Sequence, residues 1–127
     1  MNWSGILKYS FIHFFFLTAL STVINLLVGS NNLINLPSIN LILYFYLPSF
    51  IGSAVILIAF ANKQRLNTFI HLLVVLGLST FISTAIISIM IGEVTISSSW
   101  YVDYFFLLLS AVVALLASNI KKKRKAT

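Results

Sequence analysis

The chain has 127 residues, of which 60% are hydrophobic and only 8% are charged, and its mean hydropathy is +1.05. Soluble domains carry about a quarter charged residues, so this chain has too few to cover a water-facing surface. The composition excludes an ordinary soluble domain and indicates one lipid-embedded domain, residues 1–127. Because there is no cysteine, disulfides, thiolate metal sites and cysteine nucleophiles are also excluded.

Four apolar stretches are each long enough to cross a bilayer as a helix, which takes about 20 residues. They comprise residues 6–28, 41–61, 68–91 and 101–120. The first is too long for a signal peptide and no small-x-small cleavage site follows it, so we expect a retained helix. The short link at 62–67 predicts that the second and third helices are antiparallel neighbours.

Positive charge gathers on one side of the predicted bundle. All eight lysines and arginines lie at the start of the first helix, between the second and third, or after the fourth, whereas Glu93 and Asp103 lie on the other side. Retention of cations in the cytoplasm predicts a cell inner-membrane protein with both termini cytoplasmic. We interpret the tail as a membrane-surface segment, not as a nucleic-acid site. Its cations are Lys121, Lys122, Lys123, Arg124 and Lys125.

The sequence contains an internal repeat. Residues 11–25, FIHFFFLTALSTVIN, return at residues 69–83 as FIHLLVVLGLSTFIS, displaced by 58 positions and identical at seven of fifteen. Coincidence is the alternative, because apolar segments share few residue types. The repeat predicts an all-α membrane protein of four transmembrane helices, built as two parallel-repeat helical hairpins. A pseudo-two-fold axis along the membrane normal would relate the hairpins.

Small residues and a proline bear on packing. Ser110, Ala114 and Ser118 recur every fourth residue and predict close approach of the fourth helix to a neighbour. Pro48 predicts a kink in the second helix and a loosened carbonyl at Tyr44. The kink would be a hinge or a cavity wall, or an ordinary tolerated transmembrane proline, which we favour.

Polar side chains inside the spans are weak candidates for ligand or partner binding. Ser21 and Asn25 share one stripe of the first helix, and Ser79 and Ser83 occupy the corresponding positions of the third. The two stripes would line one central cleft, in which Asn25, the most polar group, would need a partner. Alternatively, the hydroxyls bond to carbonyls of their own helix.

His13 and His71 correspond in the repeat, and we expect them at matching depth, one to two turns inside the cytoplasmic interface. Three hypotheses compete. The imidazoles would bind a lipid phosphate or another anion, ligate a b-type haem, or hydrogen-bond within the bundle near the headgroups. We favour the last, and we predict no cofactor and no metal site.

Several chemistries are not expected. The sequence has no paired acids, no HExxH, no GxSxG and no phosphate-binding loop, so an enzyme is not predicted. With no carboxylate well inside a span, proton-coupled antiport lacks its usual carrier.

The plan of four short helices, both ends inside and two hairpins, resembles the GtrA-like family of small lipid-linked-sugar translocases. Residues 60–65, FANKQR, resemble the ending of that family's second helix in an asparagine, basic residues and an aromatic. Leu66 and Asn67 stand where the aromatic belongs, and the lysine run replaces the second copy of the motif. The resemblance is one of topology over most of the chain and does not identify a member.

These features predict a small non-enzymatic inner-membrane protein, an accessory or translocase-type subunit. Since four short helices enclose little space, we expect it to work as a homo-oligomer or with a membrane-protein partner. One alternative is an immunity or defence protein that binds a toxin or effector in the membrane. Another is a b-type haem electron carrier. The lipid bilayer is its expected environment, and nucleic acid is not an expected partner.

Overall fold

The computed structural model describes residues 1–29, 38–94 and 100–127, without the side chains of residues 38 and 41. Residues 29–40 and 92–99, which connect the first predicted span to the second and the third to the fourth, lie mostly outside this part. All regular structure in the described residues is helical. The elements are α1 (Trp3–Val28), α3 (Ser38–Leu41), the π-helix η1 (Ile42–Tyr46), α4 (Leu47–Ala61), α5 (Thr68–Ile91) and α6 (Trp100–Ala126).

Four helical segments are long and apolar enough to cross a membrane: Trp3–Val28, Ile42–Ala61, Thr68–Ile91 and Trp100–Ala126. This confirms the predicted all-helical chain with four potential spans. The predicted end of the fourth helix at residue 120 is wrong, because α6 continues through the lysine run. Lysine and arginine are good helix formers, and cations near a helix C-terminus interact favourably with its dipole.

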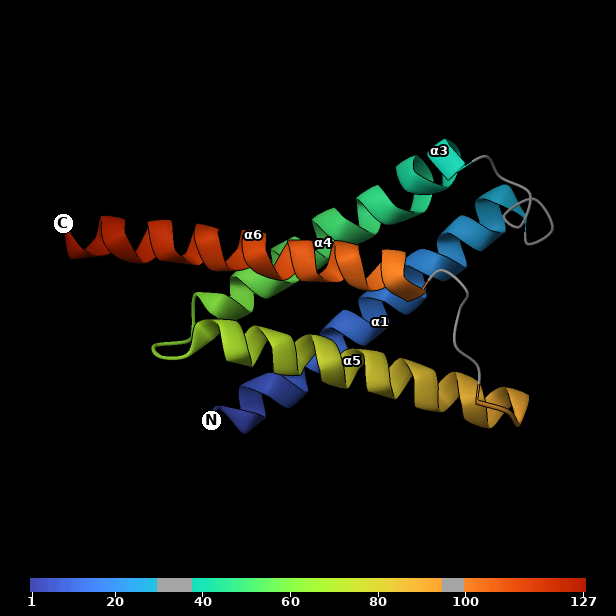
Figure 1. Ribbon diagram of the computed structural model, residues 1–127, viewed down its shortest axis with the longest axis horizontal. Helices are drawn as coiled ribbons and strands as arrows, with labels where there is room; N and C mark the ends of the chain where they lie inside the picture. Colours follow the sequence, from blue (N-terminus) through green and yellow to red (C-terminus); the bar gives the residue numbers. More distant parts are fainter. Residues whose placement is uncertain (30–37, 95–99) are drawn as a thin grey trace.

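Both chain termini and the α4–α5 link lie at one end of the bundle (Figure 1). We call this the basic end, because all eight lysines and arginines belong to the segments that meet there. The opposite end, where α1 and α5 finish and α3 and α6 begin, is the loop end. At the basic end, α6 projects farther than any other helix (Figure 1).

Large apolar side chains cover the outside of the bundle. Leu26 is 80% exposed, Phe81 70% and Ile89 81%. In water such exposure would be costly, whereas lipid solvates these groups. The exterior therefore agrees with the spans found by length and composition.

A continuous apolar core fills the half of the bundle nearer the basic end, which we call the packed half. There α1 packs against α4 and α5, and α4 packs against α6. Small buried residues of α6, Ser110, Ala111, Ala114 and Ser118, allow this close approach. The core consists of Ile6, Tyr9, Leu57, Phe60, Ala61, Leu72, Val75, Leu76, Ala111 and Ala114.

Pro48 disturbs its helix, as the sequence predicts, and the disturbance takes the form of a π-turn. The π-helix η1 ends at Tyr46, and Pro48 follows in the first turn of α4. Proline offers no N–H to the carbonyl of Tyr44 and crowds it. A wider π-turn relieves that crowding and turns the side chains of η1 relative to those of α4.

Candidate binding cavity

A cavity of about 510 Å³ lies between the helices in the half nearer the loop end, which we call the cavity half. Side chains from α1, η1, α4, α5 and α6 all line it. Ligand sites in proteins commonly measure about 300–1,000 Å³. One chain thus borders a partly open space of ligand size, which the expectation that four short helices enclose little by themselves did not include. Helices α1 and α5 diverge towards this end (Figure 1).

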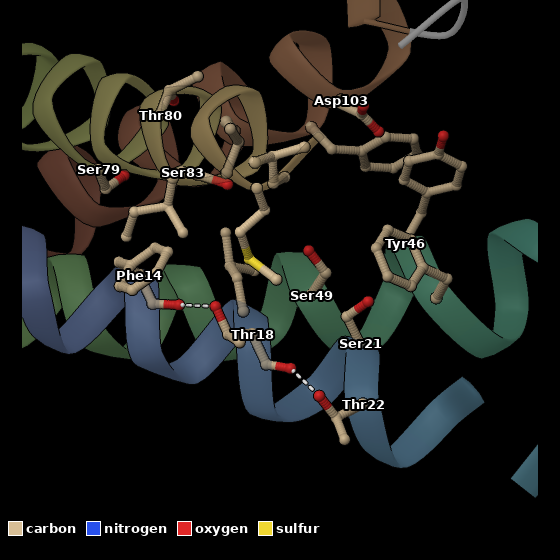
Figure 2. Close-up of a pocket in the computed structure, with 17 residues that line it drawn as sticks. Phe14, Thr18, Ser21, Thr22, Tyr46, Ser49, Ser79, Thr80, Ser83 and Asp103 are labelled. Atoms are coloured by element: carbon tan, nitrogen blue, oxygen red, sulfur yellow. Dashed lines mark hydrogen bonds between the residues drawn. The ribbon is translucent and has the colours of Figure 1, made fainter. Parts of the chain in front are cut away.

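Three threonines of the cavity wall have satisfied hydroxyls. Thr18 donates to the carbonyl of Phe14 (2.9 Å), Thr22 to that of Thr18 (2.8 Å) and Thr80 to that of Leu76 (2.8 Å). Figure 2 shows the first two of these bonds. Their hydroxyls are bonded to their own helices, as expected for threonine inside a helix. They shape the wall and offer little further hydrogen bonding.

Three serines of the wall differ from the threonines. Ser21 on α1, Ser49 on α4 and Ser83 on α5 line the cavity (Figure 2). Within the described part of the chain, none of these three hydroxyls has a hydrogen-bond partner, and together they offer donors and acceptors from three helices. The Pro48 π-turn helps to form this wall, because Tyr46 and Ser49 flank the proline and line the cavity.

Among the described residues, Asp103 is the one carboxylate lining the cavity (Figure 2). It lies in the first turn of α6, where the helix dipole favours a negative charge. The phenol of Tyr46 lies beside it, and the Tyr46 ring stacks on Phe106 with centroids 5.2 Å apart and planes 13° from parallel. This group forms an acidic aromatic corner, a name we keep for Tyr46, Asp103 and Phe106.

The sequence reasoning missed this corner. It treated Asp103 as an end position of a span, and the residue does lie in the first turn of α6, but the sequence did not indicate that it lines a cavity. The usable signal was an acid among the aromatics of residues 100–106, WYVDYFF, at an end without lysine or arginine.

His13 is fully buried and does not line the cavity itself, but it bonds to Ser79, which does. Its Nδ1 is 2.9 Å from the hydroxyl of Ser79, and its Nε2 is 2.9 Å from that of Ser53. Ser79 also donates to the carbonyl of Leu76 (3.1 Å), so its oxygen is left to accept from Nδ1–H. Ser53 then donates to Nε2. This His13 cluster (His13, Ser53, Ser79) is a satisfied polar network around a neutral imidazole.

His71 has a different role at the basic end. Its Nδ1–H donates to the carbonyl of Asn67 (2.8 Å), and its Nε2 accepts from the backbone N–H of Asn2 (3.3 Å). A carbonyl can only accept, which fixes the tautomer as Nδ1–H. His71 therefore fastens the start of α1 to the first turn of α5.

The predicted matching depth of the two histidines is wrong. Hydrogen bonds between the parallel helices α1 and α5 join residues 65, 66 and 69 positions apart, not 58. Ser79, the partner of His13, stands eight residues after His71, which is about 12 Å along a helix. The structure therefore does not bring the histidines into one site. With both nitrogens of each ring bonded inside the protein, the pair has no arrangement suited to haem ligation or anion capture.

The other predicted residues are divided. Ser21, Ser79 and Ser83 meet at the cavity, whereas Asn25 is exposed and does not line it. Among the five tail cations, Lys122 donates from Nζ to the hydroxyl of Thr68 (3.2 Å), and the others are exposed on the α6 extension. In the described ranges, no three His, Asp or Glu side chains are grouped so that they could hold a metal ion.

Comparison with known proteins supplies no family. No protein-family model, no curated protein and no solved structure matches the chain.

Proposed function

We propose that this chain is a small, non-enzymatic, multi-pass inner-membrane protein that binds an amphiphilic molecule in its cavity. We further assign it the role of a translocase-type or accessory subunit. The observation that carries this proposal is the cavity itself, which is enclosed by four potential membrane spans and lined by unpartnered serine hydroxyls.

The wall of the cavity supports an amphiphile as the ligand. Apolar side chains of α1, α5 and α6, including Leu17, Ile87 and Leu107, form much of the lining. Against them stand the hydroxyls of Ser21 and Ser83. Ligand sites commonly combine an apolar wall with a few polar groups that fix orientation. A molecule with an apolar body and a polar group would satisfy both parts.

The tight packing of the packed half supports a subunit that works together with a second protein molecule. Ile6, Leu57, Phe60 and Leu72 are all 0% exposed, and they fill the space between the cavity and the basic end. Passage of a ligand through this half requires the helices to move against one another, as in alternating access. A second copy or a membrane-protein partner would provide a surface on which such movement is controlled.

The distribution of charge supports an orientation with the basic end, and hence both termini, in the cytoplasm. Reporter fusions after Arg65 and after Thr127 should then give cytoplasmic signals, and a fusion after Asn32 an external one. An external signal at Thr127 would contradict the orientation.

Binding is tested by native mass spectrometry of the protein purified in a mild detergent. We expect a bound small molecule on the wild type, its loss in Ser21→Leu, which fills the cavity, and its retention in Asn25→Leu. Asn25 is a matched control because it is polar, lies one turn farther along α1 and does not line the cavity.

The same spectra give the oligomeric state, for which we expect a homo-oligomer or a complex with another membrane protein. A bare monomer with no bound molecule, unchanged by Ser21→Leu, would contradict the proposed function.

A further inference from the structure

We propose that the ligand of the cavity is an amphiphilic organic monocation whose positive charge lies at the acidic aromatic corner. The inference rests on the proposed function, because it names the class of molecule that the same cavity binds. It comes from the charge of the corner, the geometry of its rings and the groups around it.

Asp103 is a carboxylate for which the chain supplies no cation. All eight lysines and arginines belong to the basic end, and residues 30–37 and 95–99 contain no lysine, arginine or histidine. Along α6, Lys121 stands 18 positions after Asp103, which is about 27 Å. A half-buried carboxylate among apolar and aromatic side chains is costly without an opposite charge, and buried charges are normally paired. The missing partner is the charge of the ligand.

The rings at the corner add attraction for a cation. Tyr46 is buried, its phenol lies beside Asp103, and Phe106, which lines the cavity, stacks on its ring. The faces of aromatic rings carry negative potential and attract cations, more strongly where water is excluded. A cation at Asp103 would therefore meet a carboxylate and aromatic faces together.

The rest of the cavity accommodates the remainder of such a molecule. Ile86, Ile87 and Met90 from α5 and Leu107 from α6 offer apolar surface to its body. The oxygens of Ser21, Ser49 and Ser83 accept hydrogen bonds, so they suit the N–H groups of a protonated amine. The cavity is unfavourable for an anion, because the carboxylate of Asp103 repels it and no cationic side chain of the described residues lines the cavity.

The test compares two ions of almost the same shape and opposite charge, tetraphenylphosphonium and tetraphenylborate. Binding of each to the purified wild-type protein is measured by isothermal titration calorimetry in an uncharged detergent, with detergent alone as the blank. We expect saturable binding of the phosphonium and none of the borate. Equal or tighter binding of the borate would overturn the inference, and this comparison needs no variant.

Two matched variants locate the charge. Asp103→Asn should bind the phosphonium on the order of tenfold more weakly or worse, because it removes the carboxylate. Glu93→Gln should bind it as the wild type does, since Glu93, the chain's other acid, has the same charge but does not line the cavity. Circular dichroism and elution volume establish that each variant is folded, and Asp103→Glu, which keeps the charge, should retain binding.

The outcomes separate this inference from the proposed function. Unchanged phosphonium binding in Asp103→Asn would overturn the inference. So would a wild type that binds neither ion but carries a neutral or anionic molecule, sensitive to Ser21→Leu, in the native mass spectrum. In that last case the proposed function would stand. Failure of both ions, together with native spectra that show no bound molecule, would overturn both.

Discussion

The two halves of the bundle are built from the same four apolar helical segments and yet pack in different ways. In the packed half, small residues such as Ala61, Ala111 and Ala114 let the helices meet, and the side chains between them are fully buried. In the cavity half, the same helices enclose about 510 Å³. An apolar sequence thus allows a helix to lie in a membrane, whereas the size of the residues at its contacts decides how closely it packs against neighbouring helices.

The His13 cluster lies where the two halves meet. Ser79 contributes to both halves, because it lines the cavity and its hydroxyl bonds to the fully buried imidazole of His13. Ser53, bonded to the other ring nitrogen, lies on α4. The cluster therefore ties three helices together at the level where the cavity begins, and it is well placed to fix how far they diverge above it.

The largest expected effect comes from truncation in the packed half. Phe60 is 0% exposed and its ring lies 5.0 Å from that of Tyr9, so Phe60→Ala should lower the free energy of unfolding by about 3 kcal/mol. Ile86, 41% exposed at the cavity wall, already faces open space, so Ile86→Ala should cost about 1 kcal/mol or less. Reversible unfolding in sodium dodecyl sulfate, followed by circular dichroism, measures both. Equal losses would contradict the division into halves.

Two glycines differ in how closely other side chains approach them. A methyl group added at Gly52 would collide with the ring of Phe16, so Gly52→Ala should force that ring to move and cost about 1–2 kcal/mol. Nothing lies within 4 Å of the position where Gly77 would carry a methyl group. Gly77→Ala should therefore be neutral or stabilise α5 by up to about 1 kcal/mol, because alanine is the better helix former. The same unfolding assay measures this pair, and a more harmful Gly77→Ala would show that close approach at Gly52 is unimportant.

The histidines test the boundary between the halves. His13→Leu removes two buried hydrogen bonds and should cost about 1–2 kcal/mol, whereas His71→Leu removes bonds near the helix starts and should cost less. Because the residues are about two turns apart along the bundle, the double variant should show the sum of the two losses within about 0.5 kcal/mol. His13→Leu with Ser53→Ala should instead be far from additive, since these side chains are bonded. Strong coupling between His13 and His71 would restore a shared site.

Part of the fold was predictable from the length of the apolar stretches and from the position of a proline. The second and third spans, predicted at 41–61 and 68–91, agree with Ile42–Ala61 and Thr68–Ile91. The position of Pro48 also predicted a disturbed helix. These features are local, because each is decided by the residues within one helix.

The register between helices was not predictable in this way. The repeat suggested an offset of 58 residues between α1 and α5, whereas their hydrogen bonds join residues 65–69 apart. That offset depends on which faces of α1 and α5 pack against each other, and the pattern of repeated residues does not determine it. For the same reason the sequence pattern predicted Ser21, Ser79 and Ser83 as site residues. It did not predict Tyr46 and Asp103. Those two come from different helices and form a corner only after the bundle assembles.

The smallest effect is expected at the surface of the basic end. Replacing the five tail cations by glutamine should change the free energy of unfolding by less than about 1 kcal/mol. In the described part of the chain, only Lys122 among them bonds to another side chain, that of Thr68, and exposed polar contacts contribute little. The attraction of the tail to anionic vesicles should weaken by about 1 kcal/mol per cation near the surface. Carbonate extraction and co-sedimentation with phosphatidylglycerol vesicles measure insertion and attraction, and Lys63→Gln, outside the tail, is the control. A neutral-tail protein that fails to insert would show that the tail acts in assembly.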